Sequence, residues 1–288
     1  MYSRTTSPQP PSALEVILER DRLIVSLGLG TVIALAWAYI LLGAGMGMSA
    51  MDMAGQDHGM STSQDMDEAM RRAHAAMMQP AVWTPGYAGL MVVMWWVMMV
   101  AMMLPSASPM ILLFACIQRS QQAKGAPFVP TGVFAAGYLV VWGGFSVVAA
   151  GTQWGLERAG FLSAMMSSTS GLLGGILLLA AGVYQLTPLK HACLRHCRSP
   201  LQFITHHWRN GTAGALRMGT AHGAFCLGCC WLLMGLLFVG GVMNLYWIVG
   251  LAVLVLLEKT IPVGHWLGSF TGMGLIAWGG WVLAGTLL

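Results

Sequence analysis

Charged residues are scarce in this chain. Only 8% of its 288 residues are Asp, Glu, Lys or Arg, whereas 57% are hydrophobic. A soluble domain carries about 25% charged residues, so this chain has too few charges to coat a soluble globule of its length. The basic residues form no stripe interleaved with aromatics, which leaves nucleic-acid binding without support. No internal repeat and no phosphate-binding loop occur either. The composition indicates a polytopic membrane protein. Its length therefore bears on the number of membrane spans rather than on the number of soluble domains.

Seven apolar segments are long enough to cross a membrane as helices. A hydrocarbon core about 30 Å thick takes roughly 20 residues of helix. We expect an all-α polytopic membrane protein, a bundle of about seven transmembrane helices near residues 22–44, 87–115, 130–153, 170–188, 222–240, 243–258 and 264–286. The first segment follows the polar run MYSRTTSPQPPSALEVILERDR, and its apolar core is long for a signal peptide, which favours an uncleaved anchor.

Lys and Arg are distributed unevenly between alternate loops. With the N-terminus inside, eleven of them lie on the inner side, and only Arg71, Arg72 and Arg158 lie on the outer side. The positive-inside rule therefore predicts an inner N-terminus and an outer C-terminus. We expect a bacterial inner membrane, because no organelle-targeting segment is evident. The predicted domains are a cytoplasmic tail at 1–21, a transmembrane anchor at 22–44, an extracytoplasmic loop at 45–86 and a six-helix membrane domain at 87–288.

The expected outer loop is rich in soft metal ligands. It holds nine methionines between Met46 and Met78, together with histidines and carboxylates. Thioether sulfur is a soft, neutral ligand that suits Cu(I) and needs no deprotonation. A flexible polar loop that happens to contain methionine is the alternative. The candidate metal ligands in this loop are Met46, Met48, Met51, Met53, His58 and Met60.

The cysteines lie on the opposite, inner side. Cys226, Cys229 and Cys230 have the spacing i, i+3, i+4, which places them on one helical face. We expect them in the first turns of the fifth span, with Cys193 and Cys197 just beyond the inner end of the fourth. A reducing cytoplasm keeps such thiols free, which favours metal binding or redox chemistry over structural disulfides.

Two other features are expected at the same depth. Glu258 is the only carboxylate inside an expected span, and an intramembrane acid is a candidate functional group. An interfacial pair with Lys259 or a neighbouring Arg is the alternative. In the second span, Pro105 and Pro109 predict a break in the helix. A methionine stripe precedes these prolines, and it serves either as adaptable packing or as a stepping route for Cu(I); its members are Met91, Met94, Met98 and Met102, with Met99 and Met103 beside them.

Six motifs occur in the order found in a known bacterial family. They are WWVMMVAMMLPSASP, YLVVWGGFS, AGVYQLTPLKHACLRHCRSP, GAFCLGCCWLLM, GGVMNLYW and LLEKTIPVG. Over roughly residues 85–285 the chain resembles the predicted metal-binding integral membrane proteins, a domain of unknown function. The resemblance implies a multi-helix membrane fold and brings no defined activity. It also implies suspected metal ligands at Cys193, Cys197, Cys226, Cys229, Cys230 and Glu258.

Three functions fit these residues. The first is a metal-handling membrane protein for copper, with zinc as the alternative ion, which collects the ion at the outer loop and holds it at the inner thiols for transport, storage or delivery. The second is an accessory or assembly subunit of a larger membrane complex. The third is a membrane thiol oxidoreductase that uses Cys226 and Cys229, and it fits least because the outer loops contain no partner cysteines. The expected partners are the lipid bilayer, other membrane-complex subunits and a metal chaperone.

Overall fold

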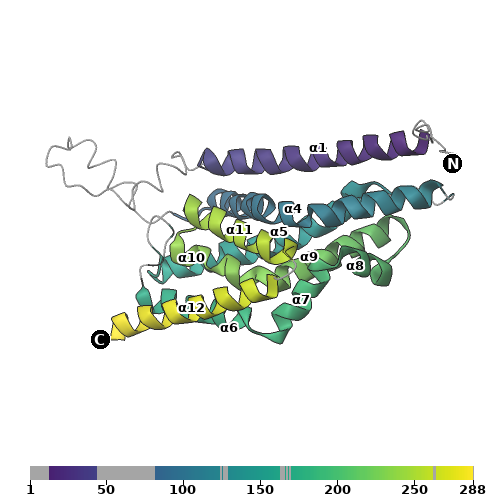
Figure 1. Cartoon of the computed structure of the whole chain (residues 1–288). Helices are drawn as coiled ribbons and strands as arrows, with labels where there is room; N and C mark the ends of the chain where they lie inside the picture. Colours follow the sequence, from purple (N-terminus) through teal and green to yellow (C-terminus); the bar gives the residue numbers. More distant parts are fainter. Residues whose placement is uncertain are drawn as a thin grey trace, which may run out of the picture.

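The computed structural model describes residues 13–43, 82–123, 125, 129–162, 166, 168, 170–261 and 264–287. This part of the chain is all-helical and contains no strand, apart from one isolated bridge between Leu162 and Ser168. The helices are α1 (Ala13–Leu41), α4 (Pro85–Ala123), α5 (Thr131–Arg158), α6 (Gly171–Gln185), α7 (Pro188–Arg198), α8 (Pro200–His207), α9 (Gly211–Gly235), α10 (Leu237–Gly240), α11 (Leu245–Thr260) and α12 (Gly264–Leu287) (Figure 1).

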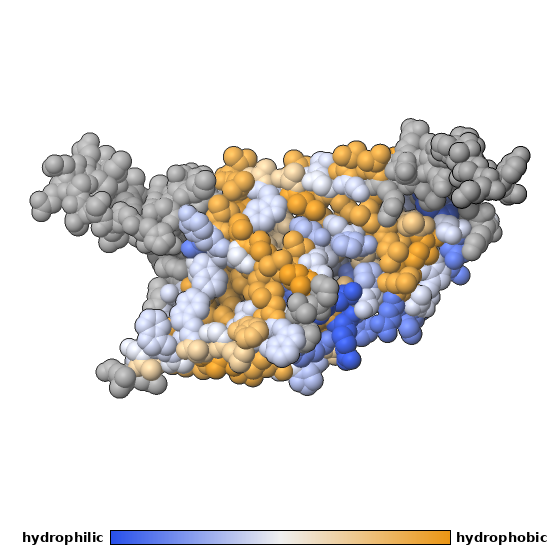
Figure 2. Space-filling model, viewed as in Figure 1, coloured by the Kyte–Doolittle hydropathy of each residue, from blue (hydrophilic) through white to orange (hydrophobic). Residues whose placement is uncertain are grey.

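The long helices lie side by side in one bundle, and α1 begins at the end opposite to that where α12 finishes (Figure 1). Helix α5 packs against α9, α6 packs against α12, and α4 contacts α1, α5 and α11. Helices α4 and α9 supply much of the buried core, whereas the Leu23–Leu41 part of α1 keeps most of its apolar side chains exposed. Figure 2 shows apolar residues over much of one face of the bundle, and hydrophilic residues gathered at the end where α7 and α8 lie.

Several helices meet the length and hydropathy that a membrane span requires. Five described segments do so, and the bent pair α6–α7 gives a sixth if it counts as one span; the five are Leu23–Leu41, Pro85–Gln122, Thr131–Arg158, Gly211–Gly240 and Trp266–Thr286. Helix α11 has 16 residues, fewer than the roughly 20 that a crossing takes. An all-α chain with several apolar helices able to span a membrane is therefore confirmed. The count of seven, the sidedness of the termini and the domain boundaries stay predictions.

The α6–α7 pair bends by 64° at a short break after Gln185. Pro188 is the first residue of α7, where its missing N–H costs no helical hydrogen bond. The Thr187 side chain accepts a hydrogen bond from the Lys190 backbone N–H and so caps the new helix. The bend lets α7 pack against α9, which carries the cysteine triplet.

The expected break at Pro105 and Pro109 is wrong, because α4 is continuous from Pro85 to Ala123. Hydroxyl groups bond to the carbonyl oxygens in this part of the helix. Ser106 Oγ donates to the Met103 carbonyl at 2.8 Å, and Tyr138 OH on α5 donates to the same oxygen at 3.2 Å. Both hydroxyls bond to the Met103 carbonyl, whereas the carbonyls that Pro105 and Pro109 leave without a helical N–H donor are those of Ala101 and Pro105.

Glycines bring α5 and α9 into close contact. A Cβ atom at Gly219 would collide with the Phe134 carbonyl, and one at Gly137 would collide with the Leu216 carbonyl. The two backbones can therefore approach closely only because these positions lack side chains. This approach places the Tyr138 hydroxyl 3.1 Å from the Sγ atom of Cys226.

Candidate metal site

The cysteine triplet lies deep inside the bundle. Cys226, Cys229 and Cys230 are only 1%, 2% and 1% exposed, and all of them are free thiols. The expectation that they occupy the first turns of a helix is wrong. Helix α9 begins at Gly211, fifteen residues before Cys226, which is about 22 Å of helix at roughly 1.5 Å per residue. The thiols are reached through the protein interior and not from an exposed helix end.

The Cys226 thiol has two polar neighbours from other helices. Lys259 Nζ on α11 donates to Cys226 Sγ at 3.0 Å, and the Tyr138 hydroxyl lies on another side of the sulfur. The same ammonium donates to Ser106 Oγ on α4 at 3.1 Å. A buried ammonium is costly unless a partner compensates it. A thiolate at Cys226 would provide the compensating negative charge.

Thioether and thiol sulfur meet next to this pair. Cys230 Sγ lies 3.8 Å from Met103 Sδ, the last methionine of the buried stripe on α4. Cys229 Sγ and Cys230 Sγ each donate to the Cys226 carbonyl oxygen at 3.0 Å. From α7, the Cys197 thiol interacts electrostatically with those of Cys226 and Cys229. Four thiols from two helices and a thioether from a third therefore form one sulfur cluster: Met103, Cys197, Cys226, Cys229 and Cys230.

In the described residues, no group of three or more His, Cys, Asp or Glu side chains is arranged to hold a metal ion as it stands. Two thiols of the sulfur cluster point to a backbone carbonyl, so rotation about their Cα–Cβ bonds must free them before they can share an ion. The chemistry of the donors nevertheless suits a soft ion, because thiolate and thioether ligands select Cu(I) over harder cations.

Other predicted ligands have different surroundings. Cys193 Sγ on α7 lies 2.9 Å from the place that a Cβ on Gly228 would occupy, so it packs against α9 beside the cluster. Glu258 instead pairs with Lys190, at 2.6 Å between Oε2 and Nζ, and accepts a hydrogen bond from Gln185 Nε2 at 2.8 Å. The alternative pair with Lys259 is not formed, since Glu258 pairs with Lys190. Metal binding by Cys193 and Glu258 stays a prediction.

The methionine stripe faces the interior along α4. All six of its members have exposed fractions of 0% or 1%: Met91, Met94, Met98, Met99, Met102 and Met103. Met91 Sδ accepts a hydrogen bond from Gln153 Nε2 at 3.6 Å, whereas Met103 reaches the thiols. The predicted outer ligands Met46, Met48, Met51, Met53, His58 and Met60 lie outside the described residues.

Sequence reasoning missed Lys259 and Tyr138 as parts of the site. One signal for Lys259 was available. Adjacent residues on a helix point in different directions, so the neighbouring charges at 258 and 259 need separate partners in an apolar helix. Tyr138 lies in the motif YLVVWGGFS, but nothing in that motif indicates which helix its hydroxyl meets.

A sequence model for the PpoB2 family, described as a copper chaperone, matches residues 92–282. The matched segment begins within α4 and ends within α12, so it contains every residue of the sulfur cluster as well as Lys259. Helix α1 and the methionine-rich loop lie outside it. No curated protein and no solved structure matches the chain.

Proposed function

The chain belongs to the PpoB2 family of copper chaperones, and on this premise we propose that it holds Cu(I) inside a membrane and passes the ion on. The observation that carries the proposal is the contact between a buried thiol and a buried thioether, with 3.8 Å between Cys230 Sγ and Met103 Sδ. Mixed thiol and thioether donors in a water-poor interior are ligands for a soft monovalent ion.

The proposed ligands are Cys226, Cys230 and Met103, with Cys197 and Cys229 as the next sulfurs available. A thiol must lose its proton to bind a metal ion, so two thiolates and one Cu(I) carry a net charge of about −1. The Lys259 ammonium, 3.0 Å from Cys226 Sγ, would neutralise that charge. Zinc fits the mixed donors less well, because it prefers nitrogen or thiolate to thioether and would leave Met103 unused.

In the copper-free protein, the Lys259 ammonium would supply part of the positive charge that the copper ion brings to the thiols. Its ammonium lies against Cys226 and Ser106, so the buried positive charge is partly compensated before copper arrives. When Cu(I) binds, the thiols release their protons and bind the ion, next to the Lys259 ammonium that is already in place. Burial would protect the thiolates from the oxidants that attack exposed ones.

Copper would approach the cluster along the methionine stripe of α4. Successive members of the stripe follow the i, i+3, i+4 spacing that keeps them on one side of the helix, and Met103 is its end at the thiols. Thioethers bind Cu(I) without releasing protons, so an ion can step between them with no proton acceptor nearby. The outer loop residues from Met46 to Met60 would collect copper at the far end of this route.

Elemental analysis of the detergent-purified full chain tests this function. We expect near-stoichiometric copper bound through sulfur after loading under reducing conditions, and loss of most of this sulfur-bound copper in the variant Cys226→Ser/Cys230→Ser. X-ray absorption should show copper–sulfur bonds in the unmodified protein. The matched control is Cys116→Ser, because Cys116 is a free cysteine of α4 that belongs to no part of the cluster. Equal copper content in all three proteins, or copper bound without sulfur, would exclude the proposed site.

A further inference from the structure

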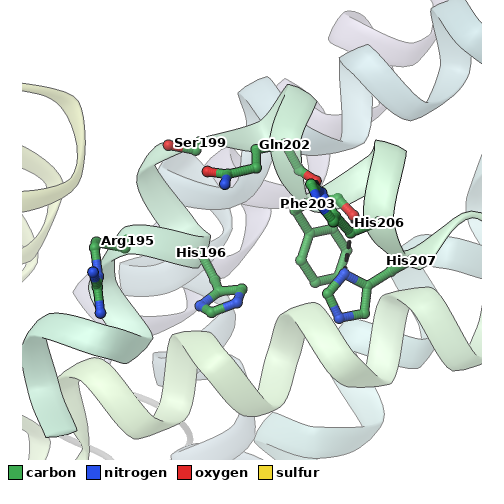
Figure 3. Close-up of a pocket in the computed structure, with 7 residues that line it drawn as sticks. All are labelled: Arg195, His196, Ser199, Gln202, Phe203, His206 and His207. Atoms are coloured by element: carbon green, nitrogen blue, oxygen red, sulfur yellow. Dashed lines mark hydrogen bonds between the residues drawn. The ribbon is translucent and has the colours of Figure 1, made fainter.

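A cavity of about 270 Å³ opens beside α7 and α8, at the hydrophilic end of the bundle. Three histidines line it, His196 from α7 and His206 and His207 from α8 (Figure 3). His196 and His207 are partly buried, and His206 is exposed, so the cavity is open to solvent. None of these residues contributes to the sulfur cluster.

Each of the three imidazole rings is held in the same way. Nδ1 contacts the carbonyl oxygen four residues earlier, at 2.9 Å for His196, 2.8 Å for His206 and 3.0 Å for His207. A carbonyl oxygen can only accept a hydrogen bond, so Nδ1 carries the proton and Nε2 of the neutral ring keeps its lone pair. This is the arrangement by which metal-binding histidines are oriented in proteins.

Two of the rings lie on opposite sides of the cavity, with their planes at 76° to each other. Figure 3 shows His196 and His207 on its opposite sides, and their ring centroids are 6.2 Å apart. Metal–imidazole bonds are about 2.0–2.1 Å, so two nitrogens that share one ion lie roughly 4 Å apart. Since each nitrogen lies about an ångström from its ring centre, the observed separation suits one shared ion. Stacking on Phe225 at 4.1 Å and on Phe203 at 4.5 Å keeps both rings in position.

Another histidine, His222, lies between the His196–His207 pair and the thiols. His222 is only 3% exposed, and its Nδ1 atom has no hydrogen-bond partner. It precedes Cys226 by one helical turn on α9, so both residues lie on the same side of that helix. Its ring lies 5.4 Å from Phe203, which in turn stacks on His207. A buried polar atom without a partner is costly, and a passing metal ion would provide one.

We propose that His196 and His207 form a second Cu(I) site, and that the ion passes between this site and the sulfur cluster by way of His222. The second step rests on the proposed function, whereas binding at the histidine pair does not. The ion keeps its oxidation state throughout. When it moves inward, bonds to neutral imidazole nitrogens break as bonds to sulfur form, and each thiol that becomes a ligand releases one proton. The vacated Nε2 atoms can accept those protons.

The charge around the cavity favours a monovalent ion. Arg195 also lines the cavity, but Figure 3 shows it on the side of His196 away from His207. Repulsion between the guanidinium and a bound cation doubles when the cation carries two charges instead of one. Two neutral imidazoles leave further coordination positions for a donor or acceptor molecule, as expected for a transfer site.

The first experiment isolates the histidine pair. In the full chain with Cys197, Cys226, Cys229 and Cys230 all changed to Ser, Cu(I) affinity is measured by competition with a colorimetric Cu(I) chelator. We expect one ion bound through nitrogen, besides any copper that the thioethers of the outer loop and the methionine stripe hold. Adding His196→Phe/His207→Phe, which keeps both stacked rings, should weaken binding at least about tenfold, since loss of even an outer-shell partner costs ~10–100-fold. The control Gln202→Ala removes another polar side chain of the same cavity, one that is no proposed ligand, and should leave affinity unchanged. The proposal would be overturned if the four-cysteine variant, its histidine-pair derivative and its control derivative all bound Cu(I) with equal affinity, or if the four-cysteine variant bound Zn²⁺ more tightly than Cu(I).

The second experiment keeps every thiol and measures the rate of copper loading from the same chelator. We expect His196→Phe/His207→Phe and His222→Phe each to slow loading of the sulfur cluster about tenfold or more while the amount of copper finally bound through sulfur stays the same. Unchanged rates would overturn the histidine route and leave the sulfur site intact. Copper content that does not depend on Cys226 and Cys230 would instead overturn the proposed function. Helix content and monodispersity of each variant show that it has folded.

Discussion

Glu258 and Lys259 are neighbours in the sequence, yet each belongs to a different cluster. The carboxylate pairs with Lys190, whereas the ammonium contacts Cys226 and Ser106. Two opposite charges side by side in an apolar helix suggest an ion pair between them, but adjacent helical residues cannot face each other. Each charge must therefore find its partner on another helix, and this is why the residue with the more direct contact to the thiols escaped the sequence interpretation.

Lys259 provides a test of charge balance at the copper site. Lys259→Met removes the ammonium and keeps much of the side-chain volume, so copper bound by two thiolates would leave an uncompensated negative charge in the interior. We expect the Cu(I) affinity to fall by about 10–100-fold, as is typical when an outer-shell partner of a metal site is lost. Chelator competition measures the change. Lys259→Arg keeps the charge and should retain more of the affinity; an unaltered affinity in Lys259→Met would show that the ammonium does not balance the site.

The contact between α5 and α9 depends on the absence of side chains at a few positions. Gly219→Ala would place a methyl group against the Phe134 carbonyl, and backbone cannot move aside as a flexible side chain can. We expect a destabilisation of about 1–3 kcal/mol, the usual cost of overpacking. Because the collision separates the helix that carries Tyr138 from the one that carries Cys226, copper binding should weaken as well.

The matched control for this change lies on the same helix. A Cβ atom at Gly235 meets nothing within 4 Å, so Gly235→Ala should be neutral or slightly stabilising, since alanine is favoured over glycine inside helices by about 0.5–1 kcal/mol. Unfolding in a denaturing detergent measures both variants against the unmodified chain. Similar stability of the two variants would mean that the close approach at Gly219 is not required.

Hydropathy predicted the apolar helices well and their ends less well. The fifth span was predicted to begin near residue 222, yet the helix begins at Gly211. The break in α4 was predicted from proline alone, a rule that considers only the local backbone. The hydroxyl of Tyr138, 35 residues away in sequence, bonds to a carbonyl in that turn, and local reasoning has no access to it.

The composition of the molecule predicted its class, and cysteine spacing predicted which thiols share a helical face. What the sequence could not predict is how α4, α5, α7 and α11 pack around α9. Met103, Cys197 and Lys259 reach the cluster from three of those helices, and none is closer than 29 residues to Cys226 in the chain. Spacing along one helix determines a face, but only packing brings residues from other helices onto it.

Because the cluster joins residues from several helices, copper should stabilise the whole bundle. An ion that binds the folded state alone adds about 2.7 kcal/mol when its free concentration is a hundred times Kd. We therefore expect Cu(I) to raise the Tm of the full chain, measured in detergent under reducing conditions, and a strong Cu(I) chelator to reverse the rise. Met103→Leu removes one sulfur at nearly constant volume and should reduce the shift, and Cys226→Ser/Cys230→Ser should abolish it. An equal rise in Tm for the double cysteine variant would place the stabilising copper elsewhere, whereas copper bound at the thiols without any rise would mean that the unfolded chain binds the ion as tightly as the folded one.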